Sequence, residues 1–333
     1  MAGKNLFGRN RKIKKVGLIV LIAILPLSLL ALVLHLKIEK NKGLDSSELV
    51  KENNNSLGNS SHQPILLAVL IVSDPTKSAT RRTIRETWLS LSDSRVKHFF
   101  VIGSKGLTSE VLQDVNDESA TFNDLLILDS VAESYYTLTN KVLSGFQWVV
   151  FNHQFNFILK CDDDSYVKLP LLLDELAKQP QKQLYWGFFK GGSTVFRNGK
   201  WSENDWFVCD TYLPYALGGG YILSQDLVEY LANNAPLLQQ FKSEDVSVGL
   251  WLSPLKIHRV HDVRFNTEYK SRGCFNSYLI THKQSANEMR EMHSNLVRTG
   301  ELCSTEIRLR YSYNYNWTAP PTKCCKDFDP ELP

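Results

Sequence analysis

From Ile65 onward, short apolar runs alternate with stretches whose apolar residues recur every three to four positions. The run from Ile65 to Ser73 is continuously apolar and rich in β-branched residues, which predicts a strand buried on both faces. Helices are predicted over 78–91 and over 135–151, where apolar side chains form one stripe. Further strands are predicted at 97–103, 124–128, 155–161 and 184–189. This alternation predicts an α/β fold, with a mostly parallel twisted sheet flanked by helices.

The residues before Ile65 follow a different pattern. Val16 to Leu36 contains no Asp, Glu, Lys or Arg. At about 1.5 Å per residue, a helix of this length reaches roughly 30 Å, the thickness of a bilayer core. Basic residues precede it, so we expect a cytoplasmic tail over 1–15 and an uncleaved transmembrane signal anchor over 16–36. A cleaved signal peptide is the alternative, but no small-residue cleavage site follows closely.

Residues 37–64 are expected to form a lumenal stem. Residues 41–64 are rich in Asn, Ser and Lys and contain no aromatic residue, so they cannot bury enough apolar area to fold. The remainder, 65–333, is expected to be one folded domain. On a lumenal chain, Asn54, Asn59 and Asn316 are candidate glycosylation sites, because each begins an Asn-X-Ser/Thr sequence.

Net charge argues against nucleic acid as a partner. The chain has 38 basic and 35 acidic residues. Without the six basic residues before Val16, the acidic residues outnumber the basic ones by three. A nucleic-acid-binding domain would instead carry a basic surplus.

The chain has six cysteines. Cys161 lies in a predicted apolar strand and is expected to be a free buried thiol. A secretory compartment permits disulfides, and some of the other five cysteines are expected to pair.

Three consecutive aspartates, Asp162, Asp163 and Asp164, directly follow the strand predicted at 155–161. Adjacent carboxylates repel one another unless a positive group offsets them. Carboxylate oxygens suit Mg²⁺ or Mn²⁺, and open parallel sheets bind ligands at the carboxyl ends of their strands. A solvated acidic turn is the other interpretation, but the position at the end of a buried strand favours a metal site.

Two later segments stand out. Gly218, Gly219 and Gly220 indicate either a close approach of the backbone to another group or a mobile turn. Glu244 and Asp245 lie at the start of a predicted helix, where acidic side chains are favourable. No glycine-rich dinucleotide or P-loop motif occurs, so neither kind of nucleotide site is predicted.

Several of these segments together resemble one family. Their order and spacing are similar to those of the β1,3-glycosyltransferases of glycosyltransferase family 31, which are type II Golgi membrane enzymes with a GT-A fold. The similarity extends from Ile65 to about Met292. The blocks at 213–221, 243–247 and 267–274 most resemble the galactosyltransferases that build the linker of proteoglycans. The matching blocks are Arg82 to Trp88, Glu133 to Lys141, the strand with Asp162 to Asp164, Tyr215 to Ser224, and Glu244 to Val246.

The resemblance implies a reaction. Galactose would pass with inversion from UDP-galactose to the 3-hydroxyl of galactose in a galactosyl-xylosyl-serine linker, with Mn²⁺ as cofactor, in glycosaminoglycan biosynthesis. By the family pattern, Asp164 and His282 would ligate Mn²⁺, and Asp245 would be the catalytic base. Asp162 and Asp163 would face the uridine and ribose of the nucleotide or orient the site.

The remaining candidates have competing structural interpretations. Lys141, Arg82 and Arg85 are candidates for donor binding. The alternative for Lys141 is a solvated lysine, and the alternative for Arg82 and Arg85 is a structural role in ion pairs. Trp186, Tyr215 and Glu244 are candidates for acceptor binding, although a tryptophan in a strand is more often core. For His282 taken alone, the alternative is a hydrogen-bonded surface histidine.

Other function classes remain open at this stage. A glycosidase also uses two carboxylates but needs no nucleotide donor. A non-catalytic anchored lectin or chaperone would not need the aspartate triplet or Asp245, and both are present. A β1,3-N-acetylglucosaminyl- or galactosyltransferase acting on other glycans is the nearest alternative.

Overall fold

The computed structural model describes residues 65–326 and 328–333. The expected tail (1–15), membrane anchor (16–36) and stem (37–64), with Asn54 and Asn59, lie outside the described residues. Within the described part, none of the helices is both long and apolar enough to cross a bilayer.

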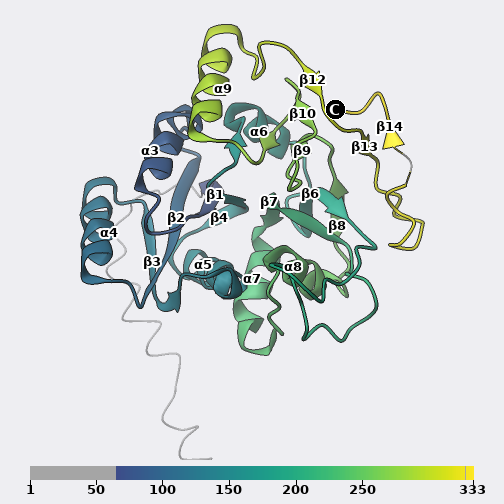
Figure 1. Cartoon of the computed structure of the whole chain (residues 1–333), viewed down its shortest axis with the longest axis horizontal. Coiled ribbons are helices and arrows are strands. Elements are labelled where there is room, and N and C mark those ends of the chain that lie inside the picture. The colour runs from purple at the N-terminus through teal and green to yellow at the C-terminus, as the bar shows by residue number, and fades with distance from the viewer. Residues whose placement is uncertain (1–64, 327) are drawn as a thin grey trace, which may run out of the picture. The chain divides into compact units, whose positions relative to one another are not determined.

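A seven-stranded sheet runs through the described domain in the order β3-β2-β1-β4-β7-β6-β8 (Figure 1). The first four of these strands are parallel, and β8 is parallel to β6. Strand β7 is antiparallel to both β4 and β6. The predicted α/β fold with a mostly parallel sheet is therefore confirmed. The strands are β1 (Ile65–Val72), β2 (Val96–Lys105), β3 (Leu125–Ala132), β4 (Phe155–Asp162), β6 (Leu184–Lys190), β7 (Tyr215–Ser224) and β8 (His258–His261).

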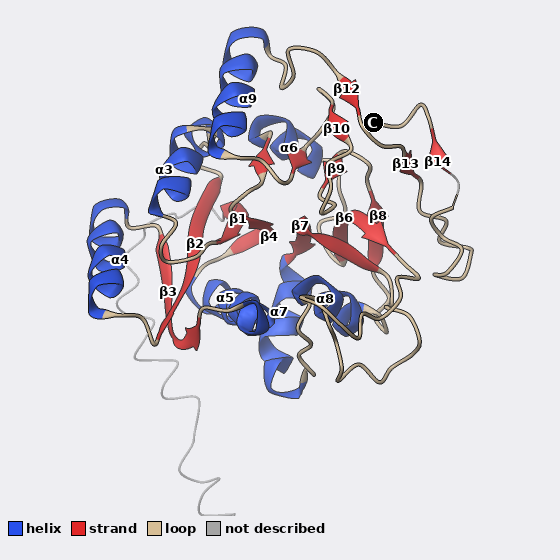
Figure 2. Ribbon diagram, viewed as in Figure 1, coloured by secondary structure: helices blue, strands red, loops and turns tan. Residues whose placement is uncertain are grey.

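Helices cover both faces of this sheet (Figure 2). The alternation of side chains along β1 explains why: Leu67 and Ile71 pack with residues of α3, α6 and α9, whereas Ala68 and Leu70 pack with residues of α5 and α7. Both faces of the strand are therefore buried, as its continuously apolar sequence predicts. The helices are α3 (Ser78–Glu86), α4 (Ser109–Phe122), α5 (Leu138–Asn152), α6 (Leu169–Leu176), α7 (Gln225–Asn234), α8 (Glu244–Leu252) and α9 (Ala286–Thr299).

Short elements complete the domain. Strands β5 (Tyr166–Val167), β11 (Ile280–Thr281) and β9 (Phe265–Asn266) form a small sheet that joins the segment after β4 to the last third of the chain. The other short elements are η2 (Trp88–Leu91), η3 (Tyr135–Thr137), η4 (Ala235–Leu237), β10 (Gly273–Cys274), β12 (Ile307–Arg308), β13 (Ser312–Tyr313) and β14 (Phe328–Asp329).

The cysteines divide into two disulfides and two free thiols within the described residues. Cys274 pairs with Cys303, which ties β10 to the segment that follows α9, and Cys324 pairs with its neighbour Cys325. Cys161 is free and buried, as predicted, and Cys209 is free and exposed.

Candidate active site

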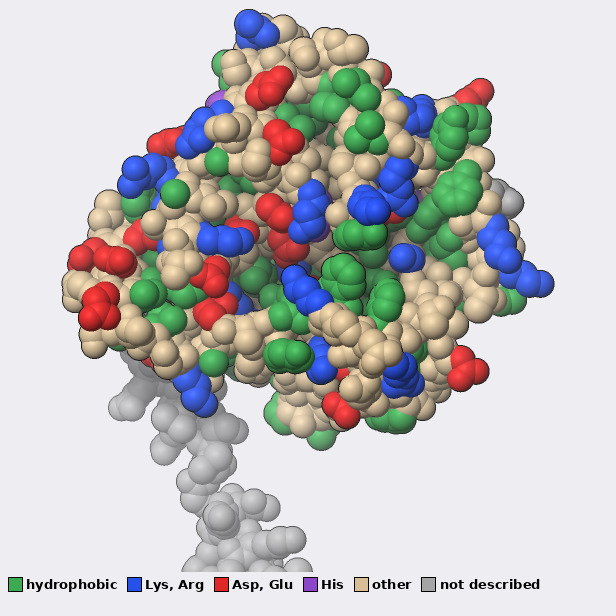
Figure 3. All heavy atoms as spheres, viewed as in Figure 1, with side chains coloured by type: hydrophobic (Ala, Val, Ile, Leu, Met, Phe, Trp, Pro, Cys, Tyr) green, Lys and Arg blue, Asp and Glu red, His purple; other side chains and the backbone are tan. Residues whose placement is uncertain are grey.

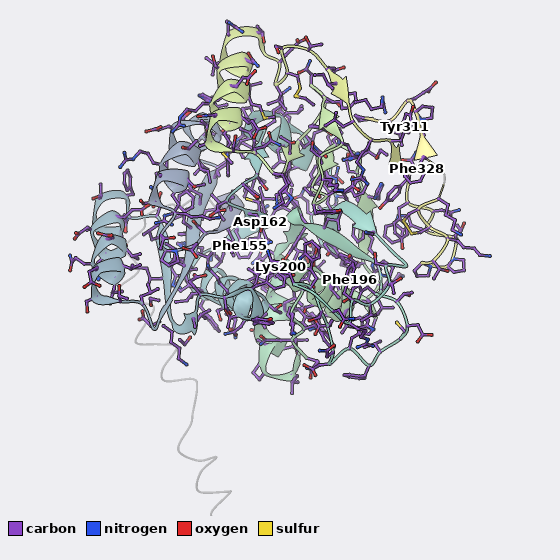
Figure 4. The ribbon with its side chains drawn as sticks, viewed as in Figure 1. Phe155, Asp162, Phe196, Lys200, Tyr311 and Phe328 are labelled. Carbon is purple, nitrogen blue, oxygen red and sulfur yellow. A yellow bond between two sulfur atoms is a disulfide. The ribbon has the colours of Figure 1, made fainter. Side chains whose placement is uncertain are left out.

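The aspartate triplet lies where two central strands end together. In the register of the sheet, Val72 at the end of β1 pairs with Asp162 at the end of β4. Phe155 and Asp162 mark the two ends of β4 in Figure 4. The three carboxylates therefore follow the carboxyl edge of the parallel strands, where ligands of such sheets bind.

Asp162, Asp164 and His282 form one cluster in which a ligand atom from each lies within 4.8 Å of the others. His282 Nε2 lies 2.8 Å from Asp164 Oδ1 and 3.4 Å from Asp162 Oδ2. The histidine is nearly buried, so the surface histidine considered above is excluded. Strand pairing explains the encounter, since Thr281, directly before His282, pairs with Tyr166, just after the triplet.

The geometry of this cluster fits a divalent cation. Asp164 Oδ1 and His282 Nε2 are both buried, and neither has an aligned hydrogen-bond partner among the described residues. Buried polar atoms normally have such partners, so two that converge without one suit a shared metal ion. Two carboxylates and an imidazole form a donor set that Mn²⁺ accepts.

Charge within the cluster favours its ionised carboxylates. Burial raises the pKa of Asp162 and of Asp164, but the neighbouring cations outweigh it and hold both pKa values below their ordinary range. For His282, burial lowers the pKa, but the two aspartates outweigh that effect and raise it to about 9. A cation binding at Nε2 would therefore displace a proton at neutral pH.

Asp163 points into a different set of contacts. Its carboxylate accepts hydrogen bonds from Ser73 Oγ and Lys77 Nζ, each at 2.9 Å. The guanidinium of Arg81, which is fully buried, donates to the same Ser73 oxygen at 3.1 Å. Asp163 thus joins the triplet to β1 and α3, and its side chain is not part of the three-residue cluster.

Lys160 connects the triplet with helix α8. Its side chain is 1% exposed, and its Nζ lies 2.9 Å from Asp162 Oδ1 and 3.0 Å from Glu244 Oε2. It also donates to the carbonyl oxygen of Gly218 at 2.7 Å. A buried ammonium needs such partners, and here two acidic groups and a carbonyl supply them.

Asp245 lies beside Gly218, the residue whose carbonyl oxygen accepts a hydrogen bond from Lys160. Its carboxylate accepts the backbone N–H of Gly218 and that of Val246, each at 2.9 Å. Burial and the adjacent Glu244 carboxylate raise the pKa of Asp245 to about 6, although Lys160 and the two amides oppose the shift. A carboxylate with such a pKa is well matched to accept a proton near neutral pH.

The three glycines of β7 pack closely against the residues around the site. A Cβ at Gly219 would lie 2.6 Å from the His282 ring, and one at Gly218 would lie 3.3 Å from Asp245 Oδ2. A Cβ at Gly220 would meet Ile280 at 3.1 Å. The glycines therefore permit a close approach of the backbone, which was one of the two interpretations of this segment.

The donor-binding candidates Lys141, Arg85 and Arg82 have unequal positions. Lys141 is buried and donates to Glu133 at 2.6 Å and to the carbonyl oxygen of Ser73 at 2.7 Å. The interpretation of Lys141 as a solvated lysine is therefore wrong. Arg85 pairs with Asp124 at 2.7 Å, just before β3 and thus at the amino end of that strand. It is a structural ion-pair partner, whereas Arg82 is exposed.

The three acceptor-binding candidates are all buried. Trp186 is 0% exposed and donates through Nε1 to Asp262, so its proposed stacking on a sugar ring is wrong and the core interpretation is correct. Tyr215 packs with Trp206 and Phe241 in a small core, which leaves it little surface for an acceptor. Glu244 contacts Lys160 and the Tyr221 hydroxyl.

The candidate glycosylation site Asn316 is exposed and accepts hydrogen bonds from Thr318.

Sequence reasoning missed several residues of this region. Lys160 carried a signal, because it is a lone charge within the apolar strand before the triplet. Lys283 bonds to Asp164 Oδ2 at 2.9 Å and has a positive φ of 64°, an uncommon conformation for a lysine directly after a candidate metal ligand. Lys77 had no signal, since its partner Asp163 is far away in the sequence.

Comparison with known families identifies the class of protein that this fold and site define. The galactosyltransferase family profile matches residues 79–263, more than half of the chain. The chain therefore belongs to the galactosyltransferase family and is a galactosyltransferase, in agreement with the resemblance to glycosyltransferase family 31.

Individual relatives differ in how much of them the chain covers. It is 46% identical over 267 residues to "Beta-1,3-galactosyltransferase 6" of Mus musculus, covering 78% of this chain and 82% of the relative. It is 34% identical to "UDP-GalNAc:beta-1,3-N-acetylgalactosaminyltransferase 2" of Xenopus tropicalis, over 58% of this chain and 39% of the relative. It is 32% identical to "Hydroxyproline O-galactosyltransferase GALT6" of Arabidopsis thaliana, over 67% and 34%. The chain thus spans well under half of these two longer relatives.

Solved structures show only distant likeness. A 4-diphosphocytidyl-2C-methyl-D-erythritol synthase from Anaerococcus prevotii has a TM-score of 0.40 at 11% identity, covering 70% of this chain and 96% of that one. A mannosyltransferase from Pyrobaculum calidifontis in complex with GDP-Man and Mn²⁺ has a TM-score of 0.36 at 8% identity, covering 61% and 55%. Scores of this size decide neither fold nor chemistry.

Proposed function

We propose that the chain transfers galactose, with inversion, from UDP-galactose to the 3-hydroxyl of galactose in the galactosyl-xylosyl-serine linker of proteoglycans. We further propose Mn²⁺ dependence, a GT-A fold over residues 65–333, and a Golgi membrane location with this domain in the lumen. The 46% identity to a relative named as a β-1,3-galactosyltransferase supports the transferred sugar and the linkage, and the resemblance described above supports UDP as the carrier. The linker acceptor and the location follow from the sequence resemblance described above.

One observation carries the proposed mechanism: the cation cluster and Asp245 meet across adjacent glycines of β7. The N–H of Gly218 donates to the carboxylate of Asp245, and the next glycine, Gly219, faces the ring of His282 so closely that a Cβ would lie 2.6 Å from it. A transferase that binds a nucleotide sugar through a cation and activates a hydroxyl beside it requires this proximity. Neither group alone would distinguish transfer from binding.

In this mechanism Asp162, Asp164 and His282 hold the cation. When bound, Mn²⁺ offsets the negative charge that UDP gains as a leaving group. Asp245 accepts the proton of the acceptor 3-hydroxyl as that oxygen attacks the anomeric carbon of galactose. The bond from that carbon to UDP breaks, and its electron pair leaves with UDP. Attack opposite the leaving group converts an α-linked donor into a β-linked product.

The variant Asp245→Asn tests this role. It should retain UDP binding and lose transfer, because an amide cannot accept the proton. A matched control is Asp114→Asn on the exposed face of α4, which should leave transfer unchanged. Near-normal turnover of Asp245→Asn would show that the base is another group.

Cation dependence requires its own measurement. Asp164→Ala should remove the Mn²⁺ dependence of UDP binding measured by calorimetry, and unchanged dependence would refute the assigned ligand. Offering UDP-galactose and UDP-N-acetylglucosamine with a β-galactosyl-xyloside tests the donor and acceptor. Preference for the second donor would refute the proposed donor.

A further inference from the structure

Three exposed aromatic side chains lie in contact on the surface. Phe196, Trp201 and Tyr269 are 49%, 40% and 60% exposed. The ring centroids of Phe196 and Trp201 are 6.1 Å apart, and those of Trp201 and Tyr269 are 5.9 Å apart. Figure 3 shows apolar side chains gathered beside the acidic cluster near the centre of this face. Exposed apolar side chains that occur together mark an interaction site more often than isolated ones do.

Phe196 and Trp201 belong to the loop between Ser193 and Tyr212, whose two ends lie side by side. Thr194 and Thr211 form an antiparallel bridge, and the N–H of Tyr212 donates to the carbonyl oxygen of Ser193 at 2.8 Å. Inside the loop, the buried carboxylate of Glu203 accepts the N–H of Lys242 at 2.6 Å. Lys242 lies two residues before Glu244, where α8 begins. The loop is therefore fixed to the start of the helix that carries Asp245.

The third ring is tied to the cation cluster. Tyr269 directly follows Glu268, whose carbonyl oxygen lies 3.2 Å from Nδ1 of His282. Glu268 is itself held by the fully buried Arg272, which lies 3.1 Å from its carboxylate. The ring of Tyr269 is thus one residue away from a group that touches a candidate cation ligand.

The loop also reaches the side of the proposed base. Lys200, adjacent to Trp201, places its Nζ 5.2 Å from the ring centroid of Tyr135. Lys242, two residues before Glu244, places its Nζ 4.7 Å from the ring centroid of the neighbouring Tyr136, so the same short segment of chain contacts both the loop and the start of α8. In the view of Figure 4, Lys200 lies between Asp162 and Phe196.

We propose that Phe196, Trp201 and Tyr269 form an aromatic platform that binds the acceptor glycan, and this inference rests on the proposed function. The faces of aromatic rings carry partial negative charge, which attracts the slightly positive C–H groups on the face of a sugar. Tyr269 adjoins Glu268, which contacts His282, and the loop is bonded through Glu203 to the start of the helix that carries Asp245, so a glycan lying on the rings would extend toward the point of transfer. Successive ring centroids are 6.1 and 5.9 Å apart, so the row of three rings offers separate contacts to neighbouring sugars. The platform therefore takes an acceptor of at least two sugars.

The kinetic constants of Trp201→Ala test the platform. For a β-galactosyl-xyloside acceptor, KM should rise by about two- to tenfold, the size expected for one aromatic contact. The KM for UDP-galactose should stay unchanged, and Trp201→Phe should restore most of the affinity. The loss should be smaller for a simple β-galactoside, which lacks the second sugar and reaches less of the platform.

Phe207→Ala is the matched control, because Phe207 is an exposed aromatic residue of the same loop outside the three-ring platform. It should leave both KM values unchanged. Equal thermal unfolding of the variants and the parent protein excludes misfolding as a cause. A raised KM for UDP-galactose in Trp201→Ala would assign the rings to the donor and overturn the proposal, and so would an unchanged acceptor KM.

A binding measurement separates failure of the platform from failure of the proposed function. If the parent protein transfers no galactose, the proposed function is wrong. The β-galactosyl-xyloside is then titrated alone and followed by broadening of its NMR signals. Broadening by the parent protein and the Phe207→Ala variant, but not by Trp201→Ala, supports the platform, whereas equal broadening or none overturns it.

Discussion

Lys160 donates a hydrogen bond from its Nζ to the carbonyl oxygen of Gly218 at 2.7 Å. The N–H of the same glycine donates to Asp245 at 2.9 Å. One glycine therefore contacts the buried lysine through its carbonyl oxygen and the proposed base through its amide. Because Lys160 also pairs with Asp162, the positions of the cation cluster and of the base depend on one another.

Lys160→Met should destabilise the domain by about 3–5 kcal/mol, because it leaves Asp162 and Glu244 without their buried counter-charge. Denaturant unfolding measures this loss. Lys178→Met is the control, since Lys178 is exposed and its pair with Glu175 contributes at most about 1 kcal/mol. Equal effects of the two substitutions would contradict the structural role of Lys160.

At saturating Mn²⁺, the rate of galactose transfer should fall as pH drops below about 6. Burial and Glu244 raise the pKa of Asp245 to about 6, and only the ionised carboxylate accepts a proton. In Glu244→Gln, the second of these causes is removed, so the acidic limb of kcat/KM should move to lower pH. A limb that stays in place would show that it belongs to another group.

The same pKa has a consequence for stability, with the opposite direction in pH. The folded pKa of Asp245, about 6, lies above its ordinary value of 3.8. The folded state therefore binds more protons between these values, and the contribution of Asp245 to stability falls as pH rises from about 4 to about 6. Unfolding free energies of the parent protein and of Asp245→Asn, measured across this window, should diverge. Parallel curves would contradict the assignment.

Binding of Mn²⁺ should release about one proton at pH 7. The pKa of His282, which the two aspartates raise to about 9 against the effect of burial, leaves its imidazole protonated there. The apparent affinity should consequently increase as pH rises toward 9. Calorimetry in buffers of different ionisation enthalpy counts the protons. In His282→Ala, affinity should fall and this release should disappear, whereas release that persists would come from another group.

Alanine at Gly219 and alanine at Gly218 should have different effects. The new Cβ at Gly219 would lie 2.6 Å from the ring of His282, so the ring must move and Mn²⁺ affinity should fall by about 10- to 100-fold. At Gly218 the Cβ would lie 3.3 Å from Asp245, so transfer should slow while Mn²⁺ affinity stays unchanged. Calorimetric titration with Mn²⁺ and a transfer assay separate the two. Identical losses would refute this division of the strand.

Loss of the disulfide between Cys274 and Cys303 should cost about 2–5 kcal/mol of stability, because the unfolded chain is no longer constrained by it. The double variant Cys274→Ser/Cys303→Ser measures this in denaturant unfolding. Cys209→Ser should have no effect, since that thiol is free and exposed. An unchanged midpoint in the double variant would contradict the stabilising role.

Sequence patterns predicted the sheet better than the helices. Strands such as Ile65–Val72 are buried on both faces, so their composition alone identifies them. Helix α4 was not predicted, because most of its residues are exposed and of its residues only Val115 is buried. Helix α9 was missed although it has a capping box at Ser285 and a C-terminal Gly300, both of which are readable signals.

For the candidate site, the sequence revealed groups of residues that are adjacent in the chain, but not the contacts between residues that are far apart in it. The triplet was recognised because its members are neighbours, yet its side chains separate: Asp163 turns to Ser73, whereas Asp164 meets His282. Contacts such as Lys160 with Glu244 join residues far apart in the chain, and no local pattern encodes them. Burial of Trp186 was the favoured interpretation from its place in a strand, and the structure confirms it.

The loop that carries Trp201 leaves and rejoins the domain between Ser193 and Tyr212, whose backbones are hydrogen-bonded. Lengthening such a loop costs a free energy that grows only slowly with its length. Insertions and replacements at its exposed positions would thus be tolerated while Glu203 and the strands that end at Asp162 stay as they are. If the loop selects the acceptor, new acceptor preferences can arise by natural variation in one short stretch of the gene, without renewed selection on the chemistry.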